Sequence, residues 1–65
     1  MQITILDGGG TFVYSINPMH ILGAFKDRIF GRYYIDTVNG NQFQVSSESY
    51  MRIVDWILND AGRSR

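Results

Sequence analysis

The sequence IDTVNGNQFQV at residues 35–45 indicates a β-hairpin, and a helical pattern follows it directly. Apolar and polar residues alternate on both sides of the NGN cluster, which is typical of two strands joined by a turn. A three-residue loop keeps the apolar residues of both strands on one face, with Gly40 or Asn41 in the left-handed conformation. The predicted pairs are Ile35 with Val45 and Thr37 with Phe43.

The segment SSESYMRIVDWIL at residues 46–58 predicts an amphipathic helix. Ser46 or Ser47 is a suitable N-cap, and Glu48 is favourable in the first turn because its charge lies near the positive end of the helix dipole. Gly62 suits the C′ position. One apolar stripe contains Tyr50, Ile53, Val54, Ile57 and Leu58, and the opposite side carries Arg52, Asp55 and Asn59.

Upstream, residues 2–6 and 11–16 alternate as two further strands, with DGGG between them. A turn of two residues at Gly8 and Gly9, or of four residues across DGGG, gives the same pairing, and glycines can supply the positive φ angles of a primed turn. The pairs are Leu6 with Thr11, Ile5 with Phe12 and Ile3 with Tyr14. The glycines are therefore interpreted as a hairpin turn.

Pro18 separates the predicted N-terminal hairpin from the segment that follows it. Pro18 ends the second strand, because proline lacks an amide donor and restricts Asn17 before it. Residues 18–26 fit both a helical spacing and an alternation, and we favour a helical turn near Pro18, capped by Asn17, that leads into a strand. RIFGRYYIDTV at residues 28–38 predicts one long strand.

The expected fold is α+β, with a small, mostly antiparallel sheet of about four or five strands, which can be curled, and one C-terminal amphipathic helix. Residues 1–62 would form a single domain and residues 63–65 a mobile tail. The face expected under the helix contains Ile3, Ile5, Phe12, Tyr14, Ile35, Phe43 and Val45. The other face contains Leu6, Val13, Leu22, Phe30, Tyr34 and Val38. This second apolar face requires either a curled sheet or a second subunit.

Composition limits the classes to which the chain can belong. The 65 residues include no cysteine, one histidine, and six basic and six acidic residues. Disulfides and thiolate or histidine-rich metal sites are excluded as sources of stability, so we expect a homo-oligomer, most simply a twofold dimer. There is no apolar run as long as a membrane span and no signal-peptide pattern, so we expect a soluble cytoplasmic protein without a membrane partner.

Catalytic chemistry has no support in the sequence. Five serines share a single histidine, His20, and the acidic residues lack the spacing of a metal-binding loop. No lysine follows the glycines as a P-loop requires. We therefore expect no enzymatic activity, no cofactor and no metal.

The glycine-rich turn is one candidate for ligand binding. DGGGTF at residues 7–12 resembles the phosphate-binding hairpin of the Hsp70, actin and sugar-kinase ATPases, whose motif is similar to DLGGGTFDVS. This resemblance implies a phosphate contact through amides of the hairpin. The residues concerned are Asp7, Gly8, Gly9, Gly10 and Thr11. A plain hairpin turn is the favoured interpretation.

FGRYY at residues 30–34 is the best candidate for binding a partner, because arginine and tyrosine are enriched at interface hot spots and also stack on nucleobases. The expected partner contacts are Phe30, Arg32, Tyr34 and, on the helix, Trp56. Nucleic-acid contacts would come from Lys26, Arg28 and Arg32.

Most of the chain resembles two families in its apolar spacing and turns. The order of strand, NG turn, strand, serine and helix is similar to DNA-binding LytTR domains, which implies binding of nucleic acid. The early hairpin, the asparagine at position 17 and the late NG…V..ES…I…I pattern resemble the short FlbD-type swarming-motility proteins, which are small and not obviously enzymatic. We therefore expect a non-enzymatic protein that binds another protein, as an adaptor or as an inhibitor of the kind that phages encode. LytTR-like regulation through nucleic acid and nucleotide binding are the alternatives.

Overall fold

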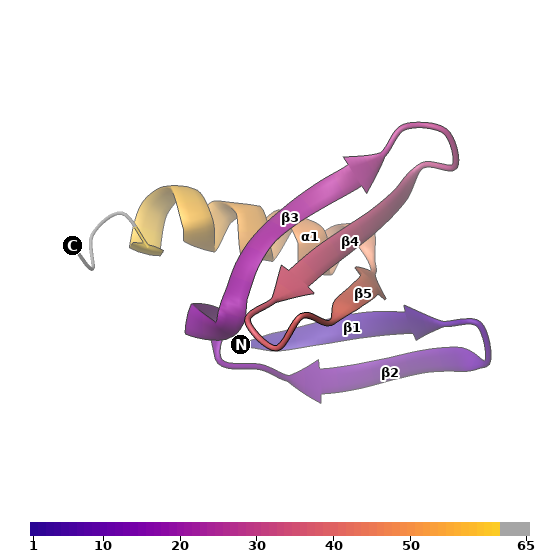
Figure 1. Ribbon diagram of the computed structural model, residues 1–65, viewed down its shortest axis with the longest axis horizontal. Coiled ribbons are helices and arrows are strands. Elements are labelled where there is room, and N and C mark those ends of the chain that lie inside the picture. Colours follow the sequence, from indigo (N-terminus) through magenta and orange to yellow (C-terminus); the bar gives the residue numbers. More distant parts are fainter. Residues whose placement is uncertain (62–65) are drawn as a thin grey trace.

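Segments of alternating apolar and polar residues form one antiparallel sheet of five strands in the order β2-β1-β5-β4-β3 (Figure 1). The structure is a computed structural model, and it describes residues 1–61 of the chain. The strands are β1 (Gln2–Asp7), β2 (Gly10–Ser15), β3 (Ile21–Asp27), β4 (Arg32–Thr37) and β5 (Gln42–Val45). The expected α+β class is confirmed. The sheet is open, with β2 and β3 at its edges, and does not close into a barrel.

Helix α1 (Ser47–Trp56) packs against one face of this sheet and lies behind β3 and β4 in the view of Figure 1. It continues into a short π-helical segment, η2 (Ile57–Ala61). Ile53 is fully buried and joins the helix to the buried side chains of four other elements. The core consists of Ile3, Ile21, Ile35, Val45 and Ile53. Within residues 1–61 this core contains five aliphatic side chains, and a small core is expected for a chain of this length.

The N-terminal hairpin has the predicted register. Ile3 pairs with Tyr14 and Ile5 with Phe12, around a two-residue turn at Gly8 and Gly9. The predicted conformation of this turn is wrong, because neither glycine has a positive φ. The turn therefore does not depend on the left-handed region that glycine alone enters freely.

The helical turn and strand predicted after Pro18 are confirmed. The 3-10 segment η1 (Pro18–His20) is capped by Asn17, whose Oδ1 accepts a hydrogen bond from the Met19 amide at 3.0 Å. Strand β3 then begins at Ile21, and its pairing with β4 shifts by one residue between Ile21 and Gly23. This bulge lies on the outer edge of the sheet.

The prediction of one long strand over residues 28–38 is wrong. Residues 28–31 form the loop between β3 and β4, and β4 spans only Arg32–Thr37. The Gly31 amide donates to the Asp27 carbonyl at 2.8 Å, and Gly31 has a φ of 67°. Asp27 Oδ1 also accepts from the Ile29 amide at 2.9 Å. A local side-chain bond of this kind stabilises a turn against a continuing strand.

The predicted pairing of β4 with β5 is also wrong. Ile35 pairs with Phe43, and Tyr33 pairs with Val45. The loop does contain three residues, but it spans 38–40 instead of 39–41, and Thr37 donates its amide to the Asn41 carbonyl at 2.9 Å. Gly40 has the expected left-handed conformation, with a φ of 83°. The faces are unchanged because the shift in register is even.

Ser46 is the N-cap of α1, and its Oγ accepts from the Ser49 amide at 3.2 Å. Ile53 is buried as predicted, and Tyr50 and Ile57 are half-buried against the core. Leu58 is wrongly assigned to the apolar stripe, because the residue is 74% exposed. The predicted cap at Gly62 and the tail at 63–65 lie outside the described residues.

The N-cap residue Ser46 and two side chains of α1 bond to the inner edge of β1. Between the end of β5 and the start of the helix, the Ser46 amide donates a hydrogen bond to the Thr4 carbonyl at 3.0 Å. The Thr4 amide donates to Ser49 Oγ at 2.7 Å, and Arg52 Nη1 donates to the Gln2 carbonyl at 3.0 Å. These three residues are spaced three apart on one side of the helix, so they bond in sequence along the strand. Arg52 is exposed on the side of the helix opposite the apolar stripe, as its position in the pattern predicts, but its bond to β1 was not predicted.

The face under the helix is narrower than predicted. Ile3, Ile35 and Val45 are buried, but Phe12 and Tyr14 are 54% and 55% exposed. Both rings belong to edge strand β2, every residue of which is exposed. One helix of this length reaches β1, β4 and β3 but does not cover β2.

Candidate protein-interaction site

Aromatic side chains gather on the β3–β4 hairpin, on the sheet face opposite the helix. Phe25 and Tyr34 face each other across the two strands and stack with ring centroids 5.4 Å apart and planes at 22°. Arg32 precedes Tyr34 on the same face, and its guanidinium lies 5.1 Å from the centre of the Phe30 ring. We call these four residues, Phe25, Phe30, Arg32 and Tyr34, the aromatic face.

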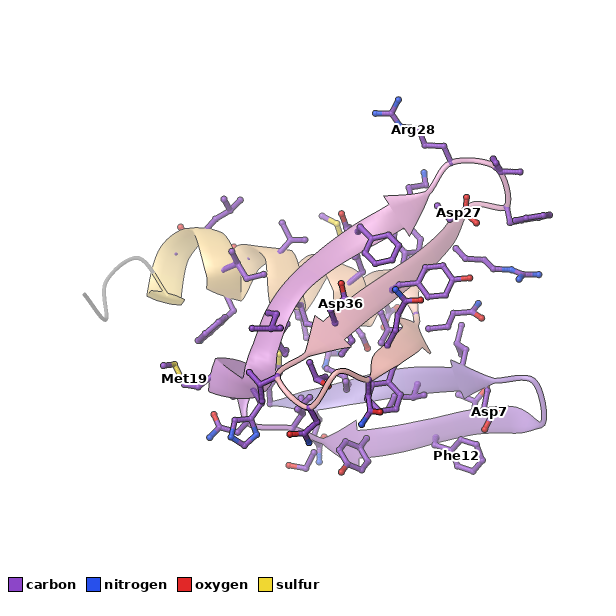
Figure 2. All side chains as sticks on the ribbon, in the orientation of Figure 1. Asp7, Phe12, Met19, Asp27, Arg28 and Asp36 are labelled. Atoms are coloured by element: carbon purple, nitrogen blue, oxygen red, sulfur yellow. The ribbon has the colours of Figure 1, made fainter. Side chains whose placement is uncertain are left out.

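The loop between β3 and β4 holds part of this surface in a defined place. Its two hydrogen bonds to Asp27 and the left-handed Gly31 fix the turn at residues 28–31. Figure 2 shows Asp27 and Arg28 at this tip, far from the turn after Asp7. Ile29 and Phe30 are 84% and 68% exposed there. Large apolar side chains on a hydrogen-bonded, exposed loop indicate a surface suited to a partner.

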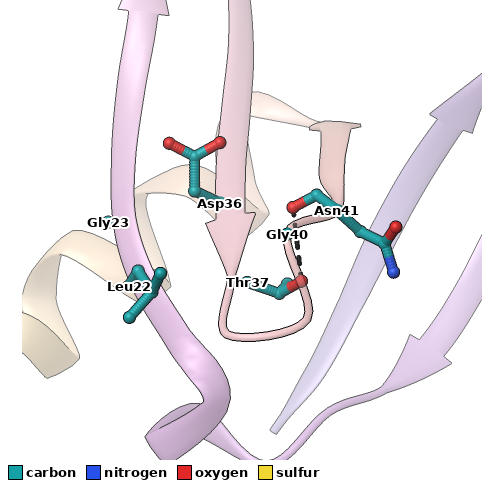
Figure 3. Close-up of a pocket in the computed structure, with 6 residues that line it drawn as sticks. All are labelled: Leu22, Gly23, Asp36, Thr37, Gly40 and Asn41. Carbon is teal, nitrogen blue, oxygen red and sulfur yellow. Dashed lines mark hydrogen bonds between the residues drawn. The ribbon is translucent and has the colours of Figure 1, made fainter.

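A shallow depression of about 310 Å³ extends the aromatic face toward the β4–β5 loop (Figure 3). It is lined by Leu22, Gly23, Asp36, Thr37, Gly40 and Asn41. The Thr37 hydroxyl donates to the Asn41 carbonyl at 3.2 Å, and Asp36 Oδ1 accepts from Gln42 Nε2 at 3.2 Å. The depression is therefore open and mostly polar, with Leu22 as its one large apolar side chain, and its polar groups already bond to one another. Such a surface suits a peptide side chain better than a small molecule, which usually binds in an enclosed pocket.

The structure brings together only part of the predicted partner contacts. Phe30, Arg32 and Tyr34 lie on one hairpin, whereas Trp56 is half-buried on the helix, on the other side of the sheet. Phe25 was not among the predicted contacts, although its pairing with Tyr34 follows from the loop at residues 28–31.

The three basic residues predicted to contact nucleic acid do not form one patch. Lys26 pairs with Tyr33 on the helix-covered face, with its Nζ 5.5 Å from the Tyr33 ring. Arg32 lies on the opposite face, and Arg28 is in the loop. Phosphate binding by a basic surface requires charges on one side of the protein, which this arrangement does not provide.

The residues predicted to contact phosphate, Asp7 to Thr11, lie at the exposed end of the β1–β2 hairpin. A hollow of about 330 Å³ lies nearby, where β1 and β5 separate after the pair Ile5–Val45. Its lining includes Asp7, Gly8, Gln42 and Gln44, and no basic residue. A carboxylate without a neighbouring cation disfavours an anionic ligand.

Within residues 1–61 there is no group of three or more His, Cys, Asp or Glu side chains arranged to hold a metal ion. None of the helices described is both long and apolar enough to cross a membrane. Comparison with known proteins finds no match, since no family model, curated protein or solved structure matches the chain.

Proposed function

We propose that this protein is non-enzymatic and acts by binding another protein through the aromatic face, as an adaptor or an inhibitor. The observation that carries this proposal is the stacked pair Phe25–Tyr34 beside Arg32 and the exposed Phe30. Burying such rings against a partner removes apolar surface from water at about 25 cal/mol per Å². Tyrosine and arginine are enriched at hot spots, and phenylalanine is enriched at interfaces in general.

The chemistry of the surface suggests what the partner presents. An apolar side chain would pack on the Phe25–Tyr34 stack or beside Leu22, and a carboxylate would pair with Arg32, which already lies over an aromatic ring. The loop at 28–31 is held by two hydrogen bonds to Asp27, and a preorganised loop loses less conformational entropy on binding.

The test is affinity capture from the native host, with wild-type protein and two charge variants as bait. Phe30→Glu places a charge in the aromatic face, and it should weaken capture of the partner at least about tenfold. Met51→Glu is the matched control, because Met51 is 64% exposed on the helix and Phe30 is 68% exposed on the loop. Equal capture by both variants would refute the aromatic face as the binding surface.

Two other functions are tested more simply. A LytTR-like regulator should bind DNA or RNA at low salt and lose affinity steeply as salt increases. A nucleotide-binding protein should release or absorb heat with common nucleotides in calorimetry, and Gly9→Ala should abolish that signal. The separation of Lys26 from Arg32 and the carboxylate at Asp7 favour protein binding over both alternatives.

A further inference from the structure

The two edges of the sheet are unequally protected against pairing with other strands. Edge strand β3 contains a bulge at Leu22, and two charged residues, Lys26 and Asp27, near its end. Bulges and charges, lysine above all, are the usual means by which proteins block an exposed edge. Edge strand β2 has neither.

Strand β2 has the sequence GTFVYS, without charge, proline or bulge, and all six of its residues are exposed. It is paired along its whole length with β1 on one side and has no strand on the other side in the described part of the chain. Its side chains alternate, with Phe12 and Tyr14 on the helix side of the sheet and Val13 on the other. An uncharged, regular, exposed edge is a template for strand addition.

The hydrogen bonds at the N-terminus show which backbone groups of β2 face outward. The Met1 amino group donates to the Ile16 carbonyl at 2.9 Å, and the Ile16 amide donates to the Met1 carbonyl at 2.8 Å. Bonded pairs alternate in an antiparallel ladder, so the even residues of β2 bond to β1 and the odd ones do not. Thr11, Val13 and Ser15 therefore direct their amides and carbonyls away from the sheet. Thr4 confirms this alternation, because both its backbone groups face α1 instead of β2.

We propose that β2 pairs antiparallel with β2 of a second copy of this chain, with Val13 at the twofold axis. Val13 then exchanges hydrogen bonds with Val13 of the second copy, and Thr11 does so with Ser15. Each such pair contributes two main-chain bonds, or about six in all. The two sheets join into one continuous sheet with both helices on the same face.

The strand itself indicates a second copy as the occupant. Antiparallel pairing about Val13 places Phe12 opposite Tyr14 of the other chain on the helix side, where each ring is about half exposed in the single chain. Aromatic cross-strand pairs are favourable, and a strand without charges meets its own copy without repulsion. This surface shares no residue with the aromatic face, so the dimer and the proposed function can fail separately.

The test uses two double variants at positions that the register places opposite each other. Thr11→Lys with Ser15→Lys puts like charges face to face across the dimer, whereas Thr11→Lys with Ser15→Glu puts opposite charges there. Sedimentation equilibrium over a micromolar concentration series measures the dimer dissociation constant against a chain mass of 7.4 kDa. We expect the Lys/Lys variant to dissociate at least about tenfold more readily than the Lys/Glu variant.

A control separates local repulsion from net charge. Met51→Lys with Leu58→Lys adds the same charge at two exposed helix positions, and it should retain the wild-type dissociation constant within about threefold. A monomeric wild type across the series would overturn the proposal, and so would equal dissociation of the Lys/Lys and Lys/Glu variants. Circular dichroism checks that each variant is folded.

A measurement on the wild type keeps the proposal testable if a variant does not fold. Amide hydrogen exchange is compared between dilute and concentrated protein. The Thr11, Val13 and Ser15 amides should gain protection at high concentration, whereas the Phe12 and Tyr14 amides, already bonded to β1, should not change. Uniform protection, or protection elsewhere alone, would overturn the proposal.

Discussion

The hairpins β1–β2 and β3–β4 are similar in length but differ in regularity and burial. β1–β2 has an unbroken register and a strand, β2, that is exposed throughout. β3–β4 contains a bulge and a left-handed glycine, yet its strands contribute Ile21 and Ile35 to the core. Regular pairing is thus not what stabilises this protein. The helix packs on both strands of the irregular hairpin but only on β1 of the regular one, where Ile3 joins the core, and packing can stabilise a less regular ladder.

The largest difference between the hairpins should appear on truncating one side chain in each. Ile35→Ala removes a side chain with no exposed surface from β4, and it should lower the free energy of unfolding by about 3 kcal/mol, through lost burial and the cavity left behind. Val13→Ala on β2, where the residue is 72% exposed, should change the free energy of unfolding by less than about 0.5 kcal/mol.

Urea denaturation, at a concentration where the chain is monomeric, measures both variants. A cost for Val13→Ala that approaches the cost for Ile35→Ala would mean that β2 is buried within the single chain, and the contrast between the hairpins would be lost.

The attachment of the β1–β2 hairpin to the rest of the molecule is tested at Ser49. Ser49 is buried, and Ser49→Ala would leave the Thr4 amide without its acceptor, at a cost of about 2 kcal/mol. Ser47→Ala is the control, because Ser47 is exposed in the same helical turn. Thermal unfolding of the two variants compares them directly, and equal melting temperatures would show that the Thr4–Ser49 bond adds nothing.

Alanine substitutions in the turns of the two hairpins should differ less in their cost to stability than the substitutions above. Gly31→Ala forces alanine to a φ of 67°, and it should cost about 1 kcal/mol. Gly9→Ala should be neutral or slightly stabilising, since Gly9 has no positive φ and no atom lies within 4 Å of an added Cβ. Guanidinium denaturation resolves this difference. Gly9→Ala as costly as Gly31→Ala would mean that the N-terminal turn also needs glycine.

The smallest expected effect is at Arg52. Arg52→Ala removes the bond to the Gln2 carbonyl, but the group is exposed, so the loss should be about 0.5 kcal/mol. Arg28→Ala, in the loop of the other hairpin, should lie within the error of the measurement. The difference in urea midpoint between the two variants measures how much the Arg52–Gln2 bond contributes to stability.

The contrast between the hairpins also explains which predictions from the sequence succeeded. The β1–β2 register follows from its turn and alternation, and Ser46 and Asn17 follow from their capping chemistry. The β4–β5 pairing was displaced by two residues, because facing apolar residues specify a register only to the nearest even shift. The 28–31 loop was missed because Ile29 and Phe30 continue the alternation of a strand.

The candidate site depended on the same loop. The residue types of the FGRYY segment were enough to predict Phe30, Arg32 and Tyr34 as contacts. Phe25 joins the aromatic face only because the chain reverses at Gly31. The exposure of Phe12 and Tyr14 could not be predicted, since nothing local in a strand shows how far a distant helix extends across the sheet.

The bonds from α1 to β1 have a consequence for the order in which the chain folds. They join Thr4 to Ser49 and Gln2 to Arg52, residues 45 and 50 positions apart. The first strand therefore completes its hydrogen bonds only when nearly the whole chain has closed into a loop. The conformational entropy of closing that loop is lost before the bonds form. We infer that the β1–β2 hairpin docks late, after the β3–β4 hairpin and the helix have met. Refolding should then be a single slow event, on a scale of milliseconds to seconds, instead of the microseconds typical of small helical proteins.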